Sequence, residues 1–328
     1  MPDIRVGLVG LGSMGANHAR VLSKLPGVNL VAIADPMGDH RSLTNNINVV
    51  SSIDRLLDEE IRYCVVASPT TNHKEAALAL IESGVAVLIE KPIAFSVSEA
   101  REIVDSANKN NVIGGVGHIE RYNPALQEAK KRILSGELGE LFQITTNRQG
   151  PFPGRIADVG VVKDLATHDI DLTSWLCGNP YTKVSTFAAH RSGRVHEDLI
   201  ACSGLVGESV VVNHVVNWMS PRKERKITII GEKGTFVVDT LHSALTIYKN
   251  GKFQVLQKEL AHFSGVTEGD VYIPAFEKQE PLISEHMAFR DKVLGLNSEI
   301  VSLESGLETL KVAEAMIMSL NTKKVVDL

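Results

Sequence analysis

Short apolar runs and amphipathic segments alternate along the first part of the chain. The runs predict buried strands, and the segments between them place apolar residues at helical spacing. Strands are predicted over residues 4–9, 30–34, 63–67, 86–90 and 112–116, with helices after residue 15 and over 53–57, 74–84 and 98–110. Apolar strands joined by helices are typical of a parallel sheet covered on both faces. The pattern therefore predicts an α/β fold that begins with a doubly wound parallel sheet.

The second half of the chain has a different pattern, in which consecutive strands are joined by short turns. Strands are predicted over 141–147, 184–189, 198–205, 209–217, 226–230, 235–239, 244–248 and 325–326, helices over 161–176, 283–294 and 303–320, and loops over 149–155 and 257–281. Residues 231–234 are expected to form a tight hairpin connection. Neighbouring antiparallel strands with one helix indicate an α+β domain with a mainly antiparallel open sheet. Such a sheet leaves one broad face for a partner subunit.

The length of 328 residues exceeds what one ordinary core supports, so two domains are expected. A helix over 124–134, followed by Gly136 and Gly139, marks the exit from the first sheet. We therefore expect one domain over residues 1–123 and a second over 124–328, with the C-terminal helix able to pack back on the first.

Composition narrows the class of protein further. With 44% hydrophobic and 22% charged residues the chain is expected to be soluble and globular. The formal net charge of −5 gives no overall attraction to nucleic acid or membrane, so neither is expected as a partner. Cys64, Cys177 and Cys202 are widely separated and lack metal-ligand spacing, which indicates reduced thiols. Asp3 precedes the first strand and no apolar run reaches roughly 20 residues, so the expected location is the cytoplasm.

A glycine-rich turn follows the first predicted strand. Gly10 permits a tight turn, Gly12 lets the backbone approach a pyrophosphate, and Gly15 lets helix and strand pack closely. The helix N-terminus offers amide N–H groups and the positive end of a dipole to phosphate oxygens. Asp35, 20 residues beyond Gly15, can accept from both ribose hydroxyls and would repel a 2′-phosphate. This arrangement predicts a Rossmann domain that binds NAD in preference to NADP.

Lys91 stands at the carboxyl end of the predicted strand over 86–90, just before Pro92, which cannot donate to a sheet ladder. In open α/β sheets, ligands bind outside the carboxyl ends of the strands. Two further turns, over 68–73 and 117–124, fall at such ends. Without context, Glu90 and Lys91 are better explained as charges that solvate a strand end, and the cofactor motif before them reverses that preference.

Asp164 and His168 are four positions apart in a predicted helix, so they lie one turn apart on one face, while Asp169 points elsewhere. A carboxylate near an imidazole can fix the ring tautomer. An ordinary histidine pKa of about 6.5 also suits a general base near neutral pH. In isolation, the same spacing fits an Asp–His pair on a helix surface.

These motifs, in this order, resemble the Gfo/Idh/MocA oxidoreductases along essentially the whole chain. The resemblance rests on residues 10–15, 68–73, 90–92, 117–124 and 164–171. It implies reversible hydride transfer between a sugar or polyol carbon and C4 of nicotinamide. By the resemblance, His168 takes the hydroxyl proton as general base and the Lys91 ammonium polarises the same oxygen. Asp164 orients His168 and the nicotinamide ribose.

The resemblance also assigns the remaining candidate residues, by ligand. Those implied for the cofactor are Gly10, Gly12, Ser13, Met14, Gly15, Asp35, Ser68, Pro69, Thr70, Asn72, His73, Glu90 and Lys91. Those implied for the substrate are Lys91, His118, Arg121, Tyr122, Asn123, Arg155, Asp164 and His168. No metal is expected. The first domain would then bind NAD, and the second would bind substrate and form a homo-oligomer, a dimer or a tetramer.

Within that family, the run over 150–162 is most similar to the UDP-N-acetylhexosamine 3-dehydrogenases, which oxidise the sugar 3-hydroxyl to a ketone before transamination. Arg155 would contact the diphosphate, because its fork of N–H donors suits phosphate oxygens. Arg155 fits an exposed loop charge equally well. Lys163 departs from the family pattern, since many relatives have glycine or another small residue before the catalytic Asp. A Lys163 that faced the pocket would change the substrate preference.

Two other functions stay open. One is an inositol or free-sugar dehydrogenase of the same family, which differs only in pocket residues. The other is a non-catalytic dinucleotide-binding regulator. The presence of Lys91, Asp164 and His168 and the lack of an added DNA-binding module favour an enzyme.

Overall fold

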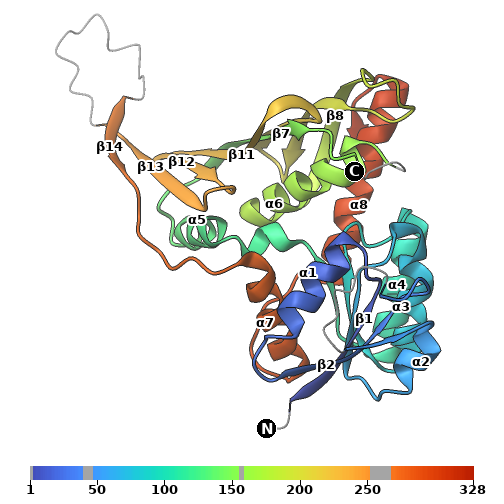
Figure 1. Ribbon diagram of the computed structural model, residues 1–328. Coiled ribbons are helices and arrows are strands. Elements are labelled where there is room, and N and C mark those ends of the chain that lie inside the picture. The colour runs from blue at the N-terminus through green and yellow to red at the C-terminus, as the bar shows by residue number, and fades with distance from the viewer. Residues whose placement is uncertain (1–2, 40–46, 155–158, 252–266) are drawn as a thin grey trace, which may run out of the picture. The chain divides into compact units, whose positions relative to one another are not determined.

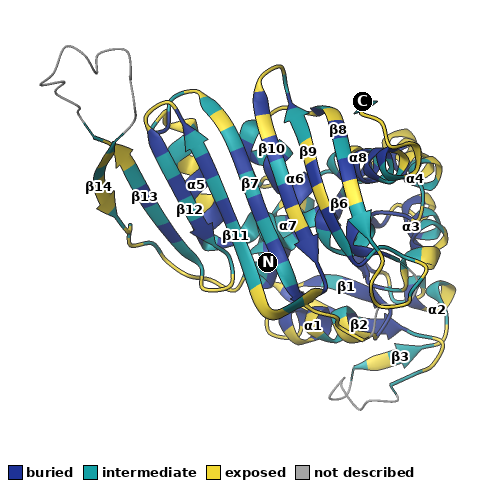
Figure 2. Ribbon diagram, turned by 90° about the horizontal axis from the view of Figure 1, so that it is seen from above, coloured by how far each residue is buried: buried dark blue, intermediate teal, exposed yellow. Residues whose placement is uncertain are grey.

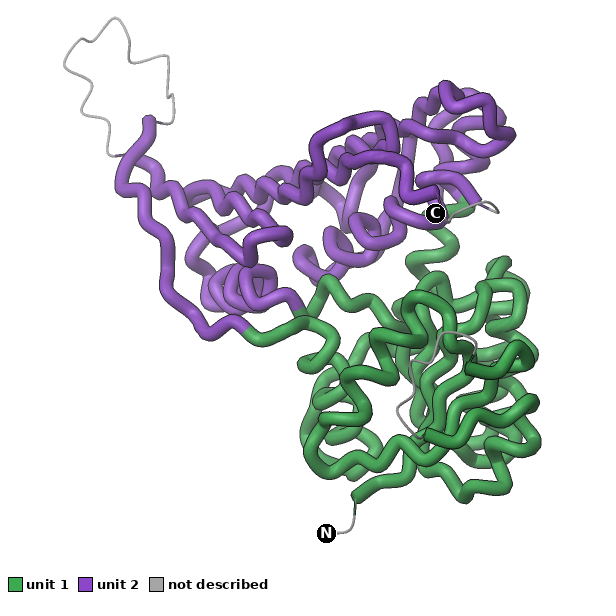
Figure 3. Tube along the Cα trace, in the orientation of Figure 1, with its two compact units in different colours: residues 1–122, 279–314 green, residues 123–278, 315–328 purple. Residues whose placement is uncertain are grey.

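The computed structural model describes residues 3–39, 47–154, 159–251 and 267–328 of the chain. The chain forms two compact units, coloured differently in Figure 3. Unit 1 comprises Met1–Tyr122 and Gln279–Glu314, and unit 2 comprises Asn123–Lys278 and Ala315–Leu328. The chain therefore passes between the units three times, whereas the sequence suggested one boundary after residue 123.

Unit 1 is built on a parallel sheet (Figure 1). Its strands are β1 (Ile4–Val9), β2 (Val28–Ala34), β3 (Asn48–Val50), β4 (Tyr63–Val66), β5 (Ala86–Glu90) and β6 (Gly114–Gly117). Its helices are α1 (Ser13–Leu22), α2 (Ile53–Leu57), α3 (His73–Glu82), α4 (Val97–Asn110) and α7 (Pro281–Val293), with 3-10 turns η1 (Thr70–Asn72) and η2 (Ile119–Tyr122). Among the described residues, this sheet has six strands in the order β3-β2-β1-β4-β5-β6, all paired in parallel. The predicted doubly wound sheet is confirmed.

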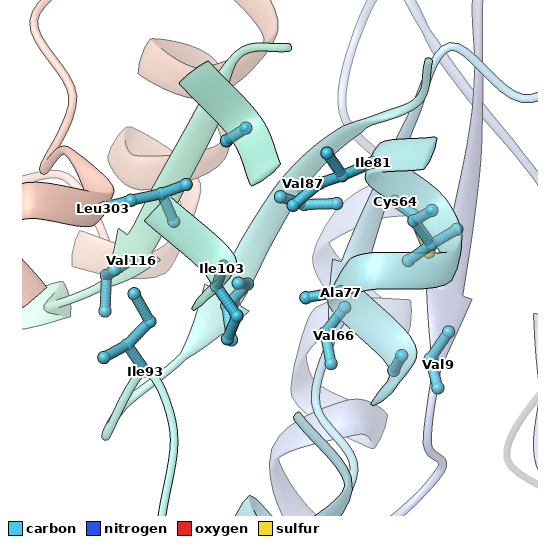
Figure 4. Close-up of a cluster of buried hydrophobic side chains, with 14 of the residues drawn as sticks. Val9, Cys64, Val66, Ala77, Ile81, Val87, Ile93, Ile103, Val116 and Leu303 are labelled. Carbon is cyan, nitrogen blue, oxygen red and sulfur yellow. The ribbon is translucent and has the colours of Figure 1, made fainter. Parts of the chain in front are cut away.

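Both faces of this sheet are buried. Successive side chains of a strand point to opposite sides, so each strand contributes to a hydrophobic cluster on either face. On β4, the side chain of Tyr63 enters one hydrophobic cluster and that of Cys64 enters the other. Helices α3 and α4 and the start of α8 (Leu303–Thr322) cover the Cys64 side, where Figure 4 shows Ala77 and Ile103. On the other side, α1 and α7 pack on the sheet, and the Phe289 ring lies edge-on to Tyr63 with centroids 5.3 Å apart.

Residues Gln279–Glu314 belong to unit 1 because α7 and the start of α8 pack against its sheet. Phe289 on α7 is fully buried, and the Arg290 side chain donates from Nη1 to the Pro26 carbonyl at 2.7 Å. Leu303, at the start of α8, joins the cluster on the opposite face of the sheet. The sequence allowed the C-terminal helix to pack back on the first domain, and in the structure α7 belongs to unit 1 as well.

Unit 2 contains a broad sheet that Figure 2 shows with buried and exposed residues alternating along its strands. Its strands are β7 (Leu141–Pro151), β8 (Tyr181–Ala189), β9 (Leu199–Val206), β10 (Val210–Asn217), β11 (Met219–Gly231), β12 (Gly234–Asp239), β13 (Ala244–Asn250), β14 (Glu268–Tyr272) and β15 (Val326–Asp327). Among the described residues, they are ordered β14-β13-β12-β11-β7-β10-β9-β8-β15. All neighbours are antiparallel except β7 and β10, so the predicted mainly antiparallel sheet is confirmed.

One face of this sheet carries helices. Helix α5 (Pro124–Leu134) packs on β12 and β13, and α6 (Thr167–Cys177) packs on β7, β9 and β10. A π-helical turn, η3 (Val162–Ala166), precedes α6. In the described ranges of the chain, no helix combines the length and the hydropathy that crossing a bilayer requires.

Two loop predictions are wrong in part. The predicted loop over 149–155 fails at its start, because β7 continues to Pro151. Gln149 pairs with Asn217 of β10 on one side and with Glu224 of β11 on the other, so two neighbouring strands hold the backbone extended. Pro151 closes the strand, a position where its missing N–H costs no ladder bond.

The predicted loop over 257–281 contains β14, which pairs with β13 at the edge of the sheet. Similarly, β3 pairs in parallel with the end of β2 within a region where no strand was predicted. Both are short edge strands with little alternation of apolar and polar residues, so they lack the pattern on which strand prediction depends.

Candidate active site

The glycine turn after β1 is so close to its neighbours that two of its glycines have no room for a side chain. A Cβ on Gly10, which has a φ of +92°, would lie 2.7 Å from the Ser68 nitrogen. A Cβ on Gly15 would lie 2.0 Å from the Gly10 carbonyl oxygen. A Cβ on Gly12 would meet nothing within 4 Å. Gly12 is the N-cap of α1, so its open side leaves space for a pyrophosphate to approach the first N–H groups of that helix.

Asp35, directly after β2, is hydrogen-bonded to the same glycine turn through its carboxylate. Its Oδ2 accepts the Leu11 backbone N–H at 2.7 Å, and its Oδ1 accepts the Met37 N–H at 2.8 Å. Carboxylate oxygens have further lone pairs, so ribose hydroxyls can still donate to them. Asp35 therefore shapes the glycine turn in addition to its predicted contact with the cofactor, a role that the sequence spacing did not reveal.

The turn after β4 is joined to the segment after β5 by the buried His73. The ring Nε2 lies 2.9 Å from the Ser68 carbonyl oxygen, and Nδ1 lies 3.0 Å from that of Pro92. Burial lowers the pKa of His73, although both carbonyls favour its protonated form. Since both nitrogens face protein carbonyls, this ring fixes the turn after β4 relative to the segment after β5. The Ser68 hydroxyl is buried and has no hydrogen-bond partner in the described chain, whereas Pro69 and Asn72 are exposed.

Glu90 ends β5, and Lys91 follows it at the same edge of the sheet. Glu90 is buried, and each of its carboxylate oxygens has a partner inside unit 1. Oε1 lies 2.9 Å from Nε2 of His18, and Oε2 accepts the Lys91 backbone N–H at 3.0 Å. Glu90, predicted to contact the cofactor, is thus connected to the site through Lys91.

The turn after β6 carries His118, which is buried, and η2, which carries the half-buried Arg121 and Tyr122. Asn123 is the N-cap of α5 in unit 2. Its side-chain oxygen accepts the Ala125 N–H at 3.0 Å, and its Nδ2 donates to the Thr240 carbonyl at 3.0 Å. Both polar side-chain atoms of Asn123 therefore fix the start of α5. The sequence predicted a substrate contact for Asn123 and did not predict this capping role.

In unit 2, Asp164 lies in the π-helical turn η3 and His168 lies in the first turn of α6. Both side chains are half-buried, as is Lys163. The predicted helix over 161–176 is therefore correct in position, but its first turn is π-helical. Single π turns inside helices are often found at functional sites.

Helix α6 is anchored to β7 by a buried ion pair. Arg148 on β7 donates from Nε to both carboxylate oxygens of Asp169, each at 3.0 Å, and both side chains are buried. Asp169 adjoins His168 and faces the sheet, whereas its helical position predicted only that it points away from the face of Asp164 and His168. At the other end of α6, Lys130 on α5 donates to the carbonyls of Trp175 and Leu176 at 2.7 and 3.2 Å. The helix that carries His168 is thus held at both ends.

Three buried polar residues of unit 1 were missed by the sequence reasoning. His18 lies on the buried face of α1, and Glu285 and His286 lie on the buried face of α7. The available signal was a polar residue on an otherwise apolar helical stripe, where burial is costly unless the group is neutral or has a partner. The predicted diphosphate contact Arg155 lies outside the described residues.

Comparison with known proteins assigns both parts of the chain. Residues 4–118 match the family model described as "Oxidoreductase family, NAD-binding Rossmann fold", and residues 130–328 match "Oxidoreductase family, C-terminal alpha/beta domain". Both models carry the family label GFO_IDH_MocA. The matches confirm the predicted fold class and the predicted NAD-binding domain.

Curated relatives are similar at the level of 30% identity. The chain is 29% identical over 193 residues to scyllo-inositol 2-dehydrogenase (NAD(+)) of Bacillus subtilis, which covers 56% of each protein. It is 28% identical over 258 residues to UDP-N-acetylglucosamine 3-dehydrogenase of Acidithiobacillus ferrooxidans, which covers 76% of this chain and 79% of the relative. The chain thus spans little more than half the length of the first relative and over three quarters of the second.

Solved structures agree in fold. That of UDP-N-acetylglucosamine 3-dehydrogenase GnnA from Acidithiobacillus ferrooxidans has a TM-score of 0.84 at 23% identity, over 98% of this chain and 99% of the other. Levoglucosan dehydrogenase, in complex with NADH and levoglucosan, has a TM-score of 0.82 at 22% identity, over 99% of both chains.

Proposed function

We propose that this chain, which belongs to the Gfo/Idh/MocA oxidoreductase family, is a dehydrogenase that transfers a hydride between a hydroxyl-bearing carbon of a sugar and NAD. The observation that carries the proposal is the succession of site residues along one sheet edge. The glycine turn follows β1, the Ser68 turn follows β4, and Lys91 follows β5, and these three strands are neighbours in a parallel sheet. The carboxyl ends of parallel strands share one edge, so a cofactor held by the first turn extends toward Lys91.

The proposed chemistry needs one acid-base group and one fixed cation. NAD, when bound, supplies the hydride acceptor at C4 of nicotinamide. His168 takes the proton of the substrate hydroxyl while the hydride leaves the same carbon, so the alcohol becomes a ketone. The Lys91 ammonium stabilises the negative charge that develops on the oxygen, and Asp164 orients His168. Each contribution of this kind is typically worth about 10²–10⁴ in rate.

For the substrate, we propose the 3-hydroxyl of a nucleotide sugar. Support comes from the run over 150–162 and from the similarity to UDP-N-acetylglucosamine 3-dehydrogenase, which extends over more of this chain than the similarity to scyllo-inositol 2-dehydrogenase. In this proposal Arg155 contacts the diphosphate, and the protein acts in the cytoplasm. The inositol dehydrogenases among the relatives make inositol the second candidate.

We also propose that the chain self-associates through the open face of the unit 2 sheet. Phe187 on β8, Ala201 on β9 and Val215 on β10 are directly paired across three strands, and all three are exposed. Phe187 is 75% exposed. An apolar row of this kind on a broad sheet is typical of an interface. Phe187→Arg and Val215→Arg should lower the oligomeric state in sedimentation, and an unchanged sedimentation coefficient would contradict this interface.

The function is tested by following NADH absorbance with UDP-N-acetylglucosamine, free N-acetylglucosamine and myo-inositol. We expect turnover of the nucleotide sugar. Turnover of myo-inositol alone would overturn the proposal that the substrate is a nucleotide sugar. Lys91→Ala and His168→Ala should each lower kcat at least about 10²-fold. NADH affinity should stay within about tenfold, or roughly 1.4 kcal/mol. His242→Ala, an exposed histidine paired with Asp239, is the matched control. An equal loss of NADH affinity in both variants would remove these residues from the catalytic role.

A further inference from the structure

The interior of unit 1 holds a cluster of titratable groups that the proposed chemistry does not use. His18 and His286 are 0% exposed, Glu285 is 1% exposed and Glu90 is 7% exposed. They come from α1, from α7 and from the end of β5, segments that lie up to 268 residues apart in the sequence. Burial of several ionisable groups is costly unless each is neutral or has a partner. The hydrogen bonds of the cluster show which of these groups have a partner.

The hydrogen bonds join Glu90, His18 and His286 in a chain. A carboxylate can only accept, so His18 donates from Nε2 to Glu90 Oε1 at 2.9 Å. The other ring nitrogen of His18, Nδ1, lies 2.9 Å from Nε2 of His286, so the two rings are directly joined. The Nδ1 atom of His286 is buried without a hydrogen-bond partner in the described chain.

The pKa directions differ between the groups of this cluster. Burial, together with the neighbouring His18, holds the pKa of His286 well below its ordinary value, so that ring is neutral. Burial by itself would raise the pKa of Glu90, but the hydrogen bond from His18 and the charges of His18 and Lys91 outweigh it and leave the pKa lowered. Burial and then the Glu90 charge raise the pKa of Glu285 well above its ordinary value, which keeps that carboxyl protonated. Of the two buried carboxyl groups, Glu90 is therefore the ionised one and Glu285 the protonated one.

We propose that His286 and His18 are positioning residues for Lys91, acting through Glu90. They hold Glu90 ionised and oriented, and its second oxygen, Oε2, accepts the Lys91 backbone N–H at 3.0 Å. Helix α1 starts at the glycine turn, so the His18–Glu90 bond ties the helix at the cofactor turn to the residue before Lys91. The ammonium is thereby fixed relative to the cofactor, and a negative charge is kept beside it. This inference rests on the proposed function of Lys91.

The charge on Glu90 has a defined set of neighbours. His18 faces it from α1, Glu285 from α7, His73 from α3 and Lys91 from the segment that follows. Burial lowers the pKa of His73. Restoring the hydrogen bond to Glu90 with a side chain of a different shape should restore turnover, a result that packing alone would not produce.

The test uses His18→Leu, which removes the donor, and His18→Gln, which keeps an N–H near the position of Nε2. We expect His18→Leu to lower kcat about 10- to 100-fold, with KM and the NADH dissociation constant within about threefold, because a displaced reacting group loses rate and not binding. His18→Gln should recover most of that loss. Glu90→Gln should lower kcat by a similar factor with KM little changed, and it decides the matter if His18→Leu does not fold.

The matched control is Arg20→Gln. Arg20 lies on the exposed side of α1 and bonds Glu280 just before α7, so it joins the same two helices without contacting the buried cluster. It should leave kcat unchanged. Equal losses in Arg20→Gln and His18→Leu would overturn the proposal, as would wild-type kcat in both His18→Leu and Glu90→Gln.

A second readout separates this inference from the proposed function. Hydrogen exchange of the Lys91 amide reports the bond to Glu90 without any substrate. Its protection should fall at least about tenfold in His18→Leu, about 1.4 kcal/mol, and persist in His18→Gln and Arg20→Gln. If the wild-type protein oxidises no sugar but this pattern appears, the proposed function fails and the positioning chain stands. Unchanged protection in His18→Leu would overturn the positioning chain, even in an active enzyme.

Discussion

The two units anchor their proposed catalytic residues in different ways. In unit 1, Lys91 follows the buried acid Glu90, whose carboxylate is held by the ring N–H of His18. In unit 2, His168 precedes the buried acid Asp169, whose carboxylate is held by Arg148. One anchor therefore continues through His18 to a second buried histidine, and the other ends at a guanidinium that binds both oxygens of its acid. Arginine stays charged at any ordinary pH, so the anchor in unit 2 keeps its cation.

Unit 2 also contains a buried histidine, but in a neutral chain. The His214 ring lies 2.8 Å from the Thr146 hydroxyl through Nδ1 and 2.8 Å from the Tyr181 hydroxyl through Nε2, and Tyr181 continues to Thr173. Hydroxyl groups can donate or accept, so this chain is satisfied without a charge. Burial, aided by the Arg148 charge, lowers the pKa of His214 to about 3. The comparison shows that hydroxyl partners keep a buried histidine neutral without a buried acid.

The largest expected effect comes from breaking the ion pair in unit 2. Arg148→Met leaves Asp169 buried without its cation and should lower the unfolding free energy of unit 2 by about 3–5 kcal/mol. Both tryptophans, Trp175 and Trp218, lie in unit 2, so tryptophan fluorescence in urea reports on this unit. The double variant Arg148→Met/Asp169→Leu should recover most of the loss. A loss below about 1 kcal/mol would show that the pair does not anchor α6.

The next effect tests the protonated acid in unit 1. The folded-state pKa of Glu285 is raised, so its contribution is complete below its unfolded pKa of about 4.3 and is lost as pH rises through the folded pKa. Glu285→Gln removes that loss. Relative to wild type, the unfolding free energy of unit 1 in Glu285→Gln should rise by about 1.4 kcal/mol per pH unit. This rise holds over the pH range where the folded Glu285 carboxyl of the wild type keeps its proton. Hydrogen exchange of α7 peptides in urea at pH 5, 6 and 7 measures the gain, with the exposed Glu280→Gln as control. A gain that is independent of pH would contradict the assignment.

A smaller effect in the opposite direction is expected for His214. Its folded-state pKa of about 3 lies below the ordinary 6.5, so its contribution is present above about pH 6.5 and is lost as pH falls. Between pH 7 and pH 5 this loss amounts to about 2 kcal/mol in unit 2. In His214→Gln, the tryptophan-monitored stability should depend on pH less steeply by that amount, and His242→Gln should behave as wild type. Parallel pH curves for His214→Gln and wild type would show that His214 does not titrate in the folded state as described.

The smallest expected effect on folding belongs to Gly12. It has a φ of −69°, and a Cβ there meets nothing within 4 Å, so Gly12→Ala should change stability by no more than about 0.5 kcal/mol. The added methyl would stand where the pyrophosphate approaches, so NADH affinity should fall at least about tenfold, or 1.4 kcal/mol. Gly15→Ala should instead destabilise unit 1, because its Cβ would lie 2.0 Å from the Gly10 carbonyl oxygen. Normal NADH binding by Gly12→Ala would place the pyrophosphate elsewhere.

Local pattern was sufficient for most elements of the fold. The strand predicted over 4–9 is β1, the helix predicted over 124–134 is α5, and the hairpin predicted over 231–234 joins β11 to β12. These predictions succeeded because the direction of a side chain repeats every two residues in a strand and every 3.6 in a helix. The edge strands β3 and β14 were missed because pairing with a neighbour, and not an apolar face, holds them extended.

The sequence by itself determined the family, the glycine turn with Asp35, the position of Lys91 after a strand and the helical spacing of Asp164 and His168. Only the tertiary structure decided which polar side chains meet in the interior. His18, Glu90 and His286 are separated by up to 268 residues, and Arg148 meets Asp169 across a sheet and a helix. The reason is physical: a periodic pattern specifies which face of an element is buried, whereas the partner of a buried charge depends on which elements that face packs against.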